Sequence, residues 1–258
     1  MSTNLQGKAI AVTGAGGGMG VETCKMLAAR GAKVSMADLA GPAEDTMHRV
    51  AEEITVAGGT VLVTAVDVTK QDQVDVWIKT TVTAFGQPLD GACNLAGILP
   101  RHFNTAKETA EDMDDDEWDR VLAVNLTGTM YCMRAQLRNM ADGGSIVNAS
   151  SIAGLMGTPK NTSYGAAKFG VVGLTKCAAL DAGRSRNIRV NALAPGTIRT
   201  AMYEEVVKGR GGLELEPTQF IQRDGRPDEV AALCCWLLCD ESSYITGQVH
   251  NIDGGYIS

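Results

Sequence analysis

The 258-residue chain has no apolar stretch of the length that a membrane span needs, so no membrane association is predicted. It also lacks a basic stripe, and its formal net charge of −7 argues against a nucleic-acid partner. No signal-like hydrophobic segment stands at the N-terminus, so we expect a soluble, cytoplasmic protein. Internal repeats and linker-like stretches are also missing, which favours a single domain over residues 1–258.

Cysteine occurs an odd number of times and without regular spacing, which does not favour a disulfide framework. Most of the seven cysteines lie in apolar runs, so we expect reduced thiols that fill a core. A zinc site at Cys234, Cys235 and Cys239 is an alternative, but adjacent cysteines point in different directions and no histidine is near. We therefore predict no metal. The cysteines are Cys24, Cys93, Cys132, Cys177, Cys234, Cys235 and Cys239.

Apolar residues make up 45% of the chain and charged residues 21%, which are ordinary globular values. Strand-like apolar runs alternate with helical patterns along the whole sequence. This alternation predicts an α/β fold with three layers, in which helices cover both faces of a doubly wound parallel sheet of about seven strands. The predicted strands lie near residues 8–13, 33–38, 60–66, 90–95, 144–150, 188–194 and 248–252.

A glycine-rich turn from Gly14 to Gly20 follows the first predicted strand and leads into a helical pattern that runs through Arg30. A strand, a glycine turn and a helix N-terminus together form a pyrophosphate site, because backbone N–H groups point outward and the missing Cβ atoms permit close approach. The alternative is a tight turn that binds nothing. The next strand favours the dinucleotide interpretation.

Asp38 ends the second predicted strand, eighteen residues beyond Gly20, near the spacing at which a carboxylate meets the adenosine ribose. A carboxylate there accepts hydrogen bonds from NAD and repels the additional phosphate of NADP. The glycine turn also holds no Arg or Lys, since Gly17 stands there. We therefore predict NAD as cofactor and consider NADP less favoured, although Asp38 as a helix cap or a solvated residue is an alternative.

Tyr164 and Lys168 lie four residues apart, and Ser151 ends a predicted strand thirteen residues upstream of the tyrosine. Tyrosine is a poor base at neutral pH because its free pKa is about 10. Four helical residues rise about 6 Å and turn about 400°, which sets both side chains on one face. At roughly 4 Å and an effective dielectric of about 20, the ammonium would stabilise the phenolate by about 4 kcal/mol, or about three pKa units.

These patterns resemble those of the short-chain dehydrogenase/reductase family of the compact type, over essentially the whole chain. The matching pieces are Thr13-Gly14-x-x-x-Gly18-x-Gly20, Asp67-Val68, Asn94 to Gly97, Asn125, Ser151, Tyr164-x-x-x-Lys168, Pro195-Gly196-Thr197 and the closing segment 246–255. The sequence departs from the family pattern at Leu95, where a second asparagine is usual. We expect altered local packing there and no loss of catalysis.

The resemblance implies an NAD(P)-binding Rossmann domain that moves a hydride between nicotinamide and a secondary alcohol or ketone. In this reading Tyr164 is the general acid/base, and Ser151 hydrogen-bonds the reacting oxygen. Lys168 favours the phenolate and holds the nicotinamide ribose, while Asn125 positions a water. The implied cofactor-binding residues are Gly14, Gly18, Met19, Gly20, Asp38, Asp67, Val68, Asn94, Ala96, Gly97, Tyr164, Lys168, Pro195, Gly196 and Thr197.

The substrate pocket is expected next to Ser151 and Tyr164, with walls from residues 99–103 and 152–156 and a lid near residues 197–226, which contain Gly209, Gly211 and Gly212. Apolar side chains there suit a hydrophobic or cyclic alcohol or ketone. The predicted substrate-binding residues are Leu99, His102 and Leu155, together with Ser151 and Tyr164. His102 in solvent and Arg101 against an acidic substrate remain open alternatives.

The acidic run at residues 112–117 has two interpretations, a metal site and the solvated start of a helix. The helix start is favoured, because Asp114 and Glu117 resemble a capping box before the helical pattern of residues 118–140.

Two functional alternatives remain from the sequence. An NADPH-dependent ketone or 3-oxoacyl reductase differs in cofactor, and a non-catalytic dinucleotide-binding regulatory protein has no need for the tyrosine and lysine. The resemblance further implies a homotetramer, or else a dimer, formed through long helices near residues 117–140 and 161–184.

Overall fold

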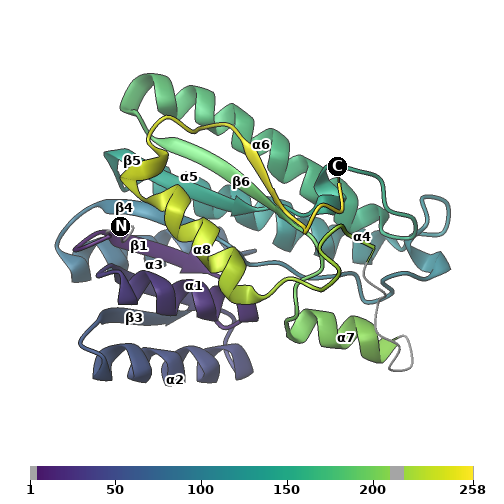
Figure 1. The fold of residues 1–258 in the computed structure, drawn as a ribbon, viewed down its shortest axis with the longest axis horizontal. Coiled ribbons are helices and arrows are strands. Elements are labelled where there is room, and N and C mark those ends of the chain that lie inside the picture. Colours follow the sequence, from purple (N-terminus) through teal and green to yellow (C-terminus); the bar gives the residue numbers. More distant parts are fainter. Residues whose placement is uncertain (1–4, 210–217, 258) are drawn as a thin grey trace.

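The computed structural model describes residues 5–209 and 218–257, which form one seven-stranded sheet with the order β3-β2-β1-β4-β5-β6-β7 (Figure 1). Every neighbouring pair is parallel. The predicted doubly wound sheet and its seven strands are confirmed, with ends that shift by a few residues. The strands are β1 (Ala9–Thr13), β2 (Lys33–Asp38), β3 (Thr60–Ala65), β4 (Leu89–Asn94), β5 (Met140–Ala149), β6 (Arg189–Pro195) and β7 (Val249–Ile252).

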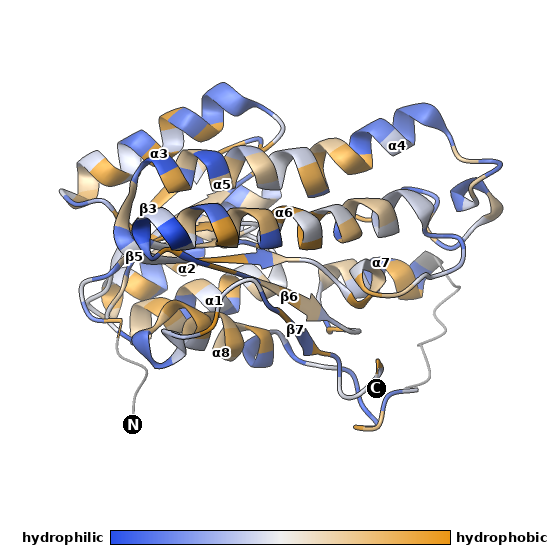
Figure 2. Cartoon of the chain, turned by 90° about the horizontal axis from the view of Figure 1, so that it is seen from above, coloured by the Kyte–Doolittle hydropathy of each residue, from blue (hydrophilic) through white to orange (hydrophobic). Residues whose placement is uncertain are grey.

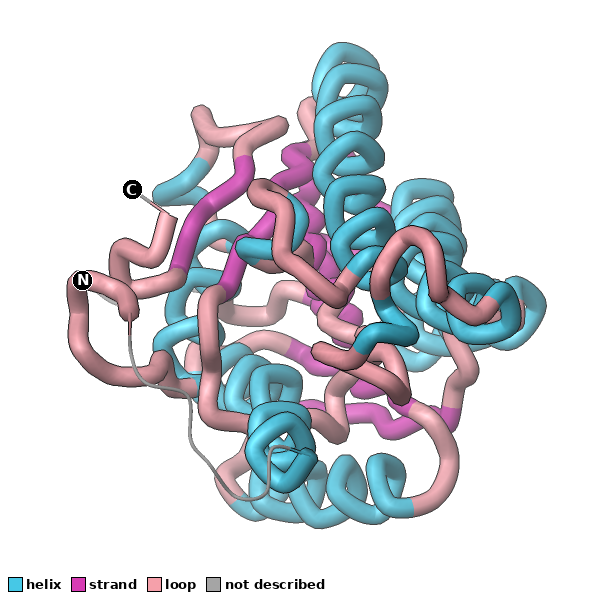
Figure 3. The backbone as a smooth tube through the Cα atoms, turned by 90° about the vertical axis from the view of Figure 1, so that its right-hand side faces the viewer, coloured by secondary structure: helices cyan, strands magenta, loops and turns pink. Residues whose placement is uncertain are grey.

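Helices form a layer on each side of the sheet (Figure 2). One layer holds α1 (Gly18–Ala29), α2 (Pro42–Val56) and α8 (Pro227–Leu238), and the other holds α3 (Gln71–Phe85), α4 (Asp115–Leu122), α5 (Thr129–Arg138) and α6 (Thr162–Arg186). The helix α7 (Ala201–Gly209) lies beyond the carboxyl ends of the strands. The same end, with its loops, faces the viewer in Figure 3.

The strand order reverses between β1 and β4, because the chain builds β1, β2 and β3 outward and then returns to the other side of β1. In open α/β sheets ligands bind outside the carboxyl ends of the strands at such a point. Thr13 and Asn94, the last residues of β1 and β4, are partners in the ladder and mark this point. The site is therefore expected just beyond them.

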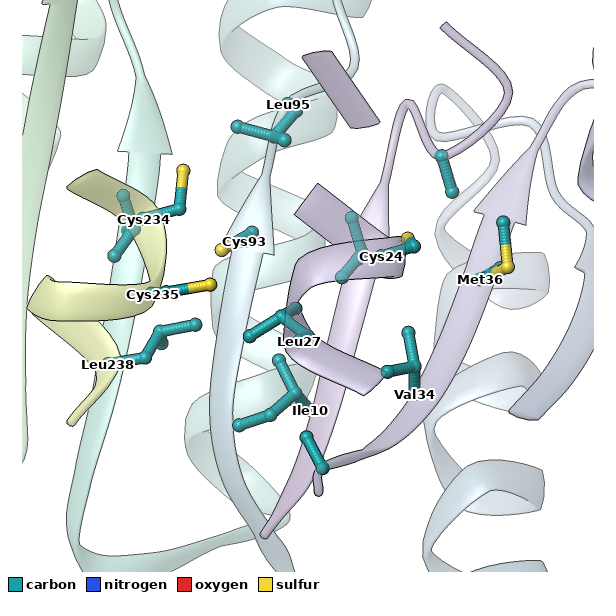
Figure 4. Packing of buried hydrophobic residues seen from close by; sticks show 14 of the residues in the cluster. Ile10, Cys24, Leu27, Val34, Met36, Cys93, Leu95, Cys234, Cys235 and Leu238 are labelled. Carbon is teal, nitrogen blue, oxygen red and sulfur yellow. The ribbon is translucent and has the colours of Figure 1, made fainter. Parts of the chain in front are cut away.

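The core under α1 and α8 is built from aliphatic side chains and thiols, among them Cys24, Cys93 and Cys234 (Figure 4). Six of the seven cysteines are buried and all seven are free, as expected, but Cys177 on α6 is exposed, so the prediction that it fills the core is wrong. In the described ranges no three His, Cys, Asp or Glu side chains are grouped to hold a metal ion. No described helix has the length and apolar character to cross a bilayer.

The acidic run begins a helix, as predicted: the Asp114 carboxylate accepts a hydrogen bond from the N–H of Glu117 at 3.0 Å. Glu117 does not complete the capping box. Its buried carboxylate instead accepts from Arg120 Nε at 2.9 Å and from the N–H of Arg101. The helix predicted at residues 118–140 is interrupted by the π-helical segment η2 (Ala123–Gly128), a feature that the apolar period does not reveal.

Candidate active site

The glycine turn brings the start of α1 against the end of β4. Gly14 has a φ of 68°, and a Cβ there would lie 2.7 Å from the backbone nitrogen of Ala96. A Cβ at Gly20 would lie 2.0 Å from the carbonyl oxygen of Gly14, so only glycine fits. The N-cap residue Gly17 supplies no side-chain cap and the first turn holds no acid, which leaves backbone N–H groups for an anion.

A cavity of about 190 Å³ adjoins this turn and is lined by the Asp38 carboxylate. Oδ2 of Asp38 accepts from the N–H of Gly16 at 2.9 Å, and Oδ1 accepts from the N–H of Leu39 at 2.8 Å. Each oxygen retains a lone pair that a ribose hydroxyl could use. Among the described residues that line this cavity, none is Lys or Arg. The glycine cradle and the carboxylate therefore fit a dinucleotide.

Nine of the predicted cofactor-binding residues line this cavity: Gly14, Gly18, Met19, Gly20, Asp38, Asp67, Val68, Ala96 and Gly97. Leu95 lines it too, so the position that departs from the family pattern belongs to the cofactor side of the sheet. Leu39 and Ile98 also line the cavity, although neither is predicted from the sequence to bind the cofactor. Each directly follows a predicted cofactor segment, and that position is the signal that could have identified them.

Asn94 does not face the cavity, contrary to the prediction. Its side chain is 2% exposed and is bonded to two other buried amides. Asn94 Nδ2 donates to Gln136 Oε1 at 3.0 Å and to Asn148 Oδ1 at 2.9 Å, while Gln136 Nε2 returns a bond to Asn94 Oδ1 at 2.7 Å. Successive residues of a strand point to opposite faces, so Asn94 joins the layer of α5 while Leu95 faces the cofactor side.

Tyr164 and Ser151 line the same cavity, and Ser151 acts to lower the pKa of the Tyr164 hydroxyl, as the predicted chemistry requires. Ser151 lies at the end of β5, where its Oγ also accepts from the N–H of Ala153 at 3.2 Å. Burial raises the pKa of Tyr164 to about 12, and Ser151 opposes that rise. No lowering of the Tyr164 pKa by Lys168 is seen, and the loss of solvation outweighs the opposing effect of Ser151.

Lys168 lies one helical turn after Tyr164 and is 3% exposed. Its Nζ is 5.3 Å from the centre of the Tyr164 ring and donates to the carbonyl oxygen of Ala149 at 2.9 Å. Burial lowers the pKa of Lys168 to about 8. The ammonium is held beside the phenol by the end of β5, as the spacing in the sequence predicts.

Asn125 is fully buried and lies in η2, next to the lysine. Its Nδ2 donates to the carbonyl oxygens of Ile98 and Val121, both at 3.0 Å, and its Oδ1 accepts from the N–H of Ile98 at 3.2 Å. A Cβ at Gly97 would lie 2.7 Å from Asn125 Oδ1 and 3.4 Å from Lys168 Nζ, so glycine permits this approach. The four predicted catalytic residues thus gather around one point.

A second cavity, of about 250 Å³, opens next to Tyr164. The predicted residues Ser151, Leu99, Pro195, Gly196 and Thr197 line it, and Met19 lines both cavities. Helix α7 adds a wall that the sequence analysis did not resolve into residues. The wall consists of Met202, Tyr203 and Val206.

Two predicted substrate residues are not brought to this cavity. His102 is exposed and is absent from the lining, which takes Phe103 from the same loop. Leu155 is absent as well, because the short helix η3 (Ile152–Gly154) presents Ile152 and Ala153 instead. Within the predicted lid, Gly209 ends α7, whereas Gly211 and Gly212 lie outside the described residues.

The comparisons with known proteins agree with this geometry. The family model described as enoyl-(acyl carrier protein) reductase matches residues 14–257. The chain is 45% identical over 256 residues to short-chain dehydrogenase/reductase aba4 of Botryotinia fuckeliana, with 96% of each chain covered. This chain belongs to the short-chain dehydrogenase/reductase family.

Two further relatives of the family carry more specific names. The 2,5-dichloro-2,5-cyclohexadiene-1,4-diol dehydrogenase of Sphingobium indicum is 37% identical over 259 residues, with 98% of each chain covered. The crystal structure of a levodione reductase matches with a TM-score of 0.88 and 34% identity, covering 96% of this chain and 97% of that one. The predicted family and fold are thereby confirmed.

Proposed function

We propose that this protein is an NAD-dependent oxidoreductase that interconverts a secondary alcohol and a ketone on a hydrophobic, cyclic substrate. The observation that carries the proposal is that Ser151 and Tyr164 line one largely apolar cavity, with Lys168 Nζ 5.3 Å from the centre of the Tyr164 ring. The relative from Sphingobium indicum, named as a dehydrogenase of a cyclic diol, supports the substrate class.

The cofactor would be held by the glycine turn, by Asp38 and by residues 195–197, and would supply the hydride acceptor for alcohol oxidation. The carboxylate of Asp38 and the lack of Lys or Arg among the described cavity residues support NAD over NADP. Asp67 and Val68 line the same cavity and would flank the adenine.

Tyr164 would take the proton from the substrate hydroxyl during oxidation and return it to the ketone oxygen during reduction. Ser151 would hydrogen-bond the same oxygen and stabilise the negative charge that develops there. With the pKa of Tyr164 raised to about 12, the neutral phenol predominates near pH 7. Alcohol oxidation should therefore accelerate toward alkaline pH, whereas ketone reduction uses the form already present.

Lys168 would provide the positive charge that favours the phenolate, and protons would reach it past Asn125. Met202, Tyr203 and Val206 of α7 would close the substrate side as part of a lid. Such a cover excludes water from the reacting atoms while the walls orient the ring.

The test is a turnover screen of purified protein with cyclic secondary alcohols and ketones, each with NAD and with NADP. Oxidation of a cyclic alcohol with at least tenfold preference for NAD is the expected result. A strong NADP preference, or turnover of 3-oxoacyl chains alone, would favour the carrier-linked reductases after which the family model is named. Absence of turnover with intact dinucleotide binding would favour a regulatory protein.

For the assembly we propose a homotetramer, supported by the exposed apolar side chains of Phe169 (48%) and Leu180 (61%) on α6. Light scattering that shows a stable monomer would reject it.

A further inference from the structure

The wall of the substrate cavity contains a buried amide whose oxygen has no hydrogen-bond partner among the described residues and no role in the proposed chemistry. Asn161 lines the same cavity as Ser151 and Tyr164 and is 6% exposed. Its Nδ2 donates to Thr158 Oγ1 at 3.2 Å, but its Oδ1 has no hydrogen-bond partner among residues 5–209 and 218–257. A buried polar atom without a partner is costly, so it calls for a physical explanation.

Helix capping does not explain it. Asn161 is the N-cap residue of α6, a position where asparagine is favoured because its side-chain oxygen accepts from an N–H of the first turn. Here the side chain makes no such bond. The asparagine therefore gives up the stabilising role that its position offers.

The first turn of α6 is held by other residues. Thr162 Oγ1 donates to the carbonyl oxygen of Glu108 at 2.9 Å, and Ser163 Oγ donates to Glu108 Oε2 at 2.9 Å. The backbone carbonyl of Asn161 accepts from the N–H of Gly165 at 2.9 Å. In the amide of Asn161, Nδ2 is bonded to Thr158, whereas Oδ1 has no structural role among the described residues.

The position of this amide relates it to the reaction. Asn161 is the N-cap residue of α6 and precedes Tyr164 by three residues. Both line the cavity, so a substrate ring that reaches Tyr164 can also reach Asn161. The rest of the wall near it is apolar or small, including Ile152, Ala153 and Pro159.

We propose that Asn161 binds a second, non-reacting hydroxyl of the substrate, so that the preferred substrates are cyclic diols or hydroxyketones and not simple alcohols. This rests on the proposed function. Oδ1 is itself buried, so a turn of the amide about its terminal torsion brings it to the cavity, where it accepts from that hydroxyl. A substrate hydroxyl is the donor that the amide lacks, while a methyl group in its place leaves Oδ1 unpaired.

The experiment compares trans-cyclohexane-1,4-diol with 4-methylcyclohexanol, which keeps the ring and the reacting alcohol but lacks the second hydroxyl. For wild-type protein, kcat/KM with NAD should be at least about tenfold higher for the diol, the discrimination expected of one buried hydrogen bond. Asn161→Leu, which has the same branching but a larger side chain without hydrogen-bonding groups, should remove this preference by lowering kcat/KM for the diol more than kcat/KM for 4-methylcyclohexanol. Asn161→Ser retains a good N-cap residue and should also lose the preference. It controls for the possibility that the leucine variant misfolds.

An equal loss for both substrates would assign Asn161 a structural role and overturn the inference, as would an unchanged preference in both variants. Asn161→Leu should lower the melting temperature only modestly, since it loses the N-cap residue and the bond to Thr158 but also removes an unpaired polar atom.

A binding measurement separates this inference from the proposed reaction. In Tyr164→Phe saturated with NAD, the diol should raise the melting temperature by ligand linkage, and adding Asn161→Leu should abolish that shift. If wild-type protein oxidised no alcohol with either dinucleotide, the proposed function would fail, and this thermal shift alone would decide whether Asn161 binds the hydroxyl. Equal shifts with and without Asn161 would reject the site.

Discussion

Lys168 Nζ lies 5.3 Å from the centre of the Tyr164 ring while it donates to the carbonyl oxygen of Ala149 at 2.9 Å. Both side chains shift away from their charged forms on burial, since the pKa of the lysine falls to about 8 and that of the tyrosine rises to about 12. The fold therefore holds a catalytic pair that is costly to charge. Such a cost is typical of a site retained for function and not for stability.

The lowered pKa of Lys168 predicts a pH-dependent stability. Between pH 8 and the unfolded value of 10.5, the unfolded chain holds the proton that the native lysine has lost, so this group makes stability rise with pH. Lys168→Met removes that dependence. From pH 7 to pH 10 the unfolding free energy of wild type should gain roughly 2 kcal/mol relative to the variant, since one pKa unit corresponds to about 1.36 kcal/mol. Urea unfolding at both pH values measures the change, and a constant difference would contradict the shift.

Asp38 should decide between the two dinucleotides. Asp38→Asn keeps the shape but removes the charge that repels a 2′-phosphate and that strengthens hydrogen bonds from the ribose. The ratio of kcat/KM for NAD to that for NADP should fall about 10- to 100-fold, as expected for hydrogen bonds to a charged group. Asp67→Asn is the control, because Asp67 lines the cavity but binds the N–H and hydroxyl of Thr69. An equal loss with both dinucleotides would reduce Asp38 to a structural role.

Gly154 allows the loop after Ser151 to pack on α6. A Cβ there would lie 2.3 Å from Ser150 Oγ and 2.7 Å from the carbonyl oxygen of Lys168. Gly154→Ala should therefore cost about 1–3 kcal/mol of stability and also lower turnover, since it displaces the catalytic helix. Gly157→Ala is the matched control in the same loop, since nothing lies within 4 Å of a Cβ there and the position has no positive φ. It should leave the unfolding free energy unchanged or raise it by about 0.4–1 kcal/mol in chemical unfolding.

A substitution of Asn94 tests whether this residue contributes to the stability of the fold and not to cofactor binding. Asn94→Leu leaves the amides of Gln136 and Asn148 without their partner and should destabilise the protein by about 2–4 kcal/mol. Since the side chain points away from the cofactor cavity, the KM for NAD should change by less than about twofold. A large rise in KM with unchanged stability would restore the cofactor role expected from the sequence.

Much of the architecture could be predicted because strand ends and glycines carry local signals. The strand that ends at Asp38 and the turn from Gly14 to Gly20 predict the cofactor end of the site from the sequence alone. The pair Tyr164 and Lys168 could be placed together because helical spacing determines which residues share a face.

The errors concern the direction in which a side chain points. Spacing did not distinguish Asn94 from its neighbour Leu95 as the residue that faces the cofactor, because that depends on which face of the sheet each one meets. On loops no period exists, so Phe103 and Ile152 could not be distinguished from His102 and Leu155. Burial, which sets the pKa values of Tyr164 and Lys168, is a property of the whole fold and not of their spacing.

The account depends on the phenol of Tyr164 as the group that exchanges a proton with the substrate oxygen, and Tyr164→Phe tests this most directly. The variant should bind NADH within about twofold of wild type by fluorescence titration, yet its kcat for a cyclic alcohol should fall by roughly 10²- to 10⁴-fold. Turnover close to that of wild type, with dinucleotide binding intact, would contradict the account.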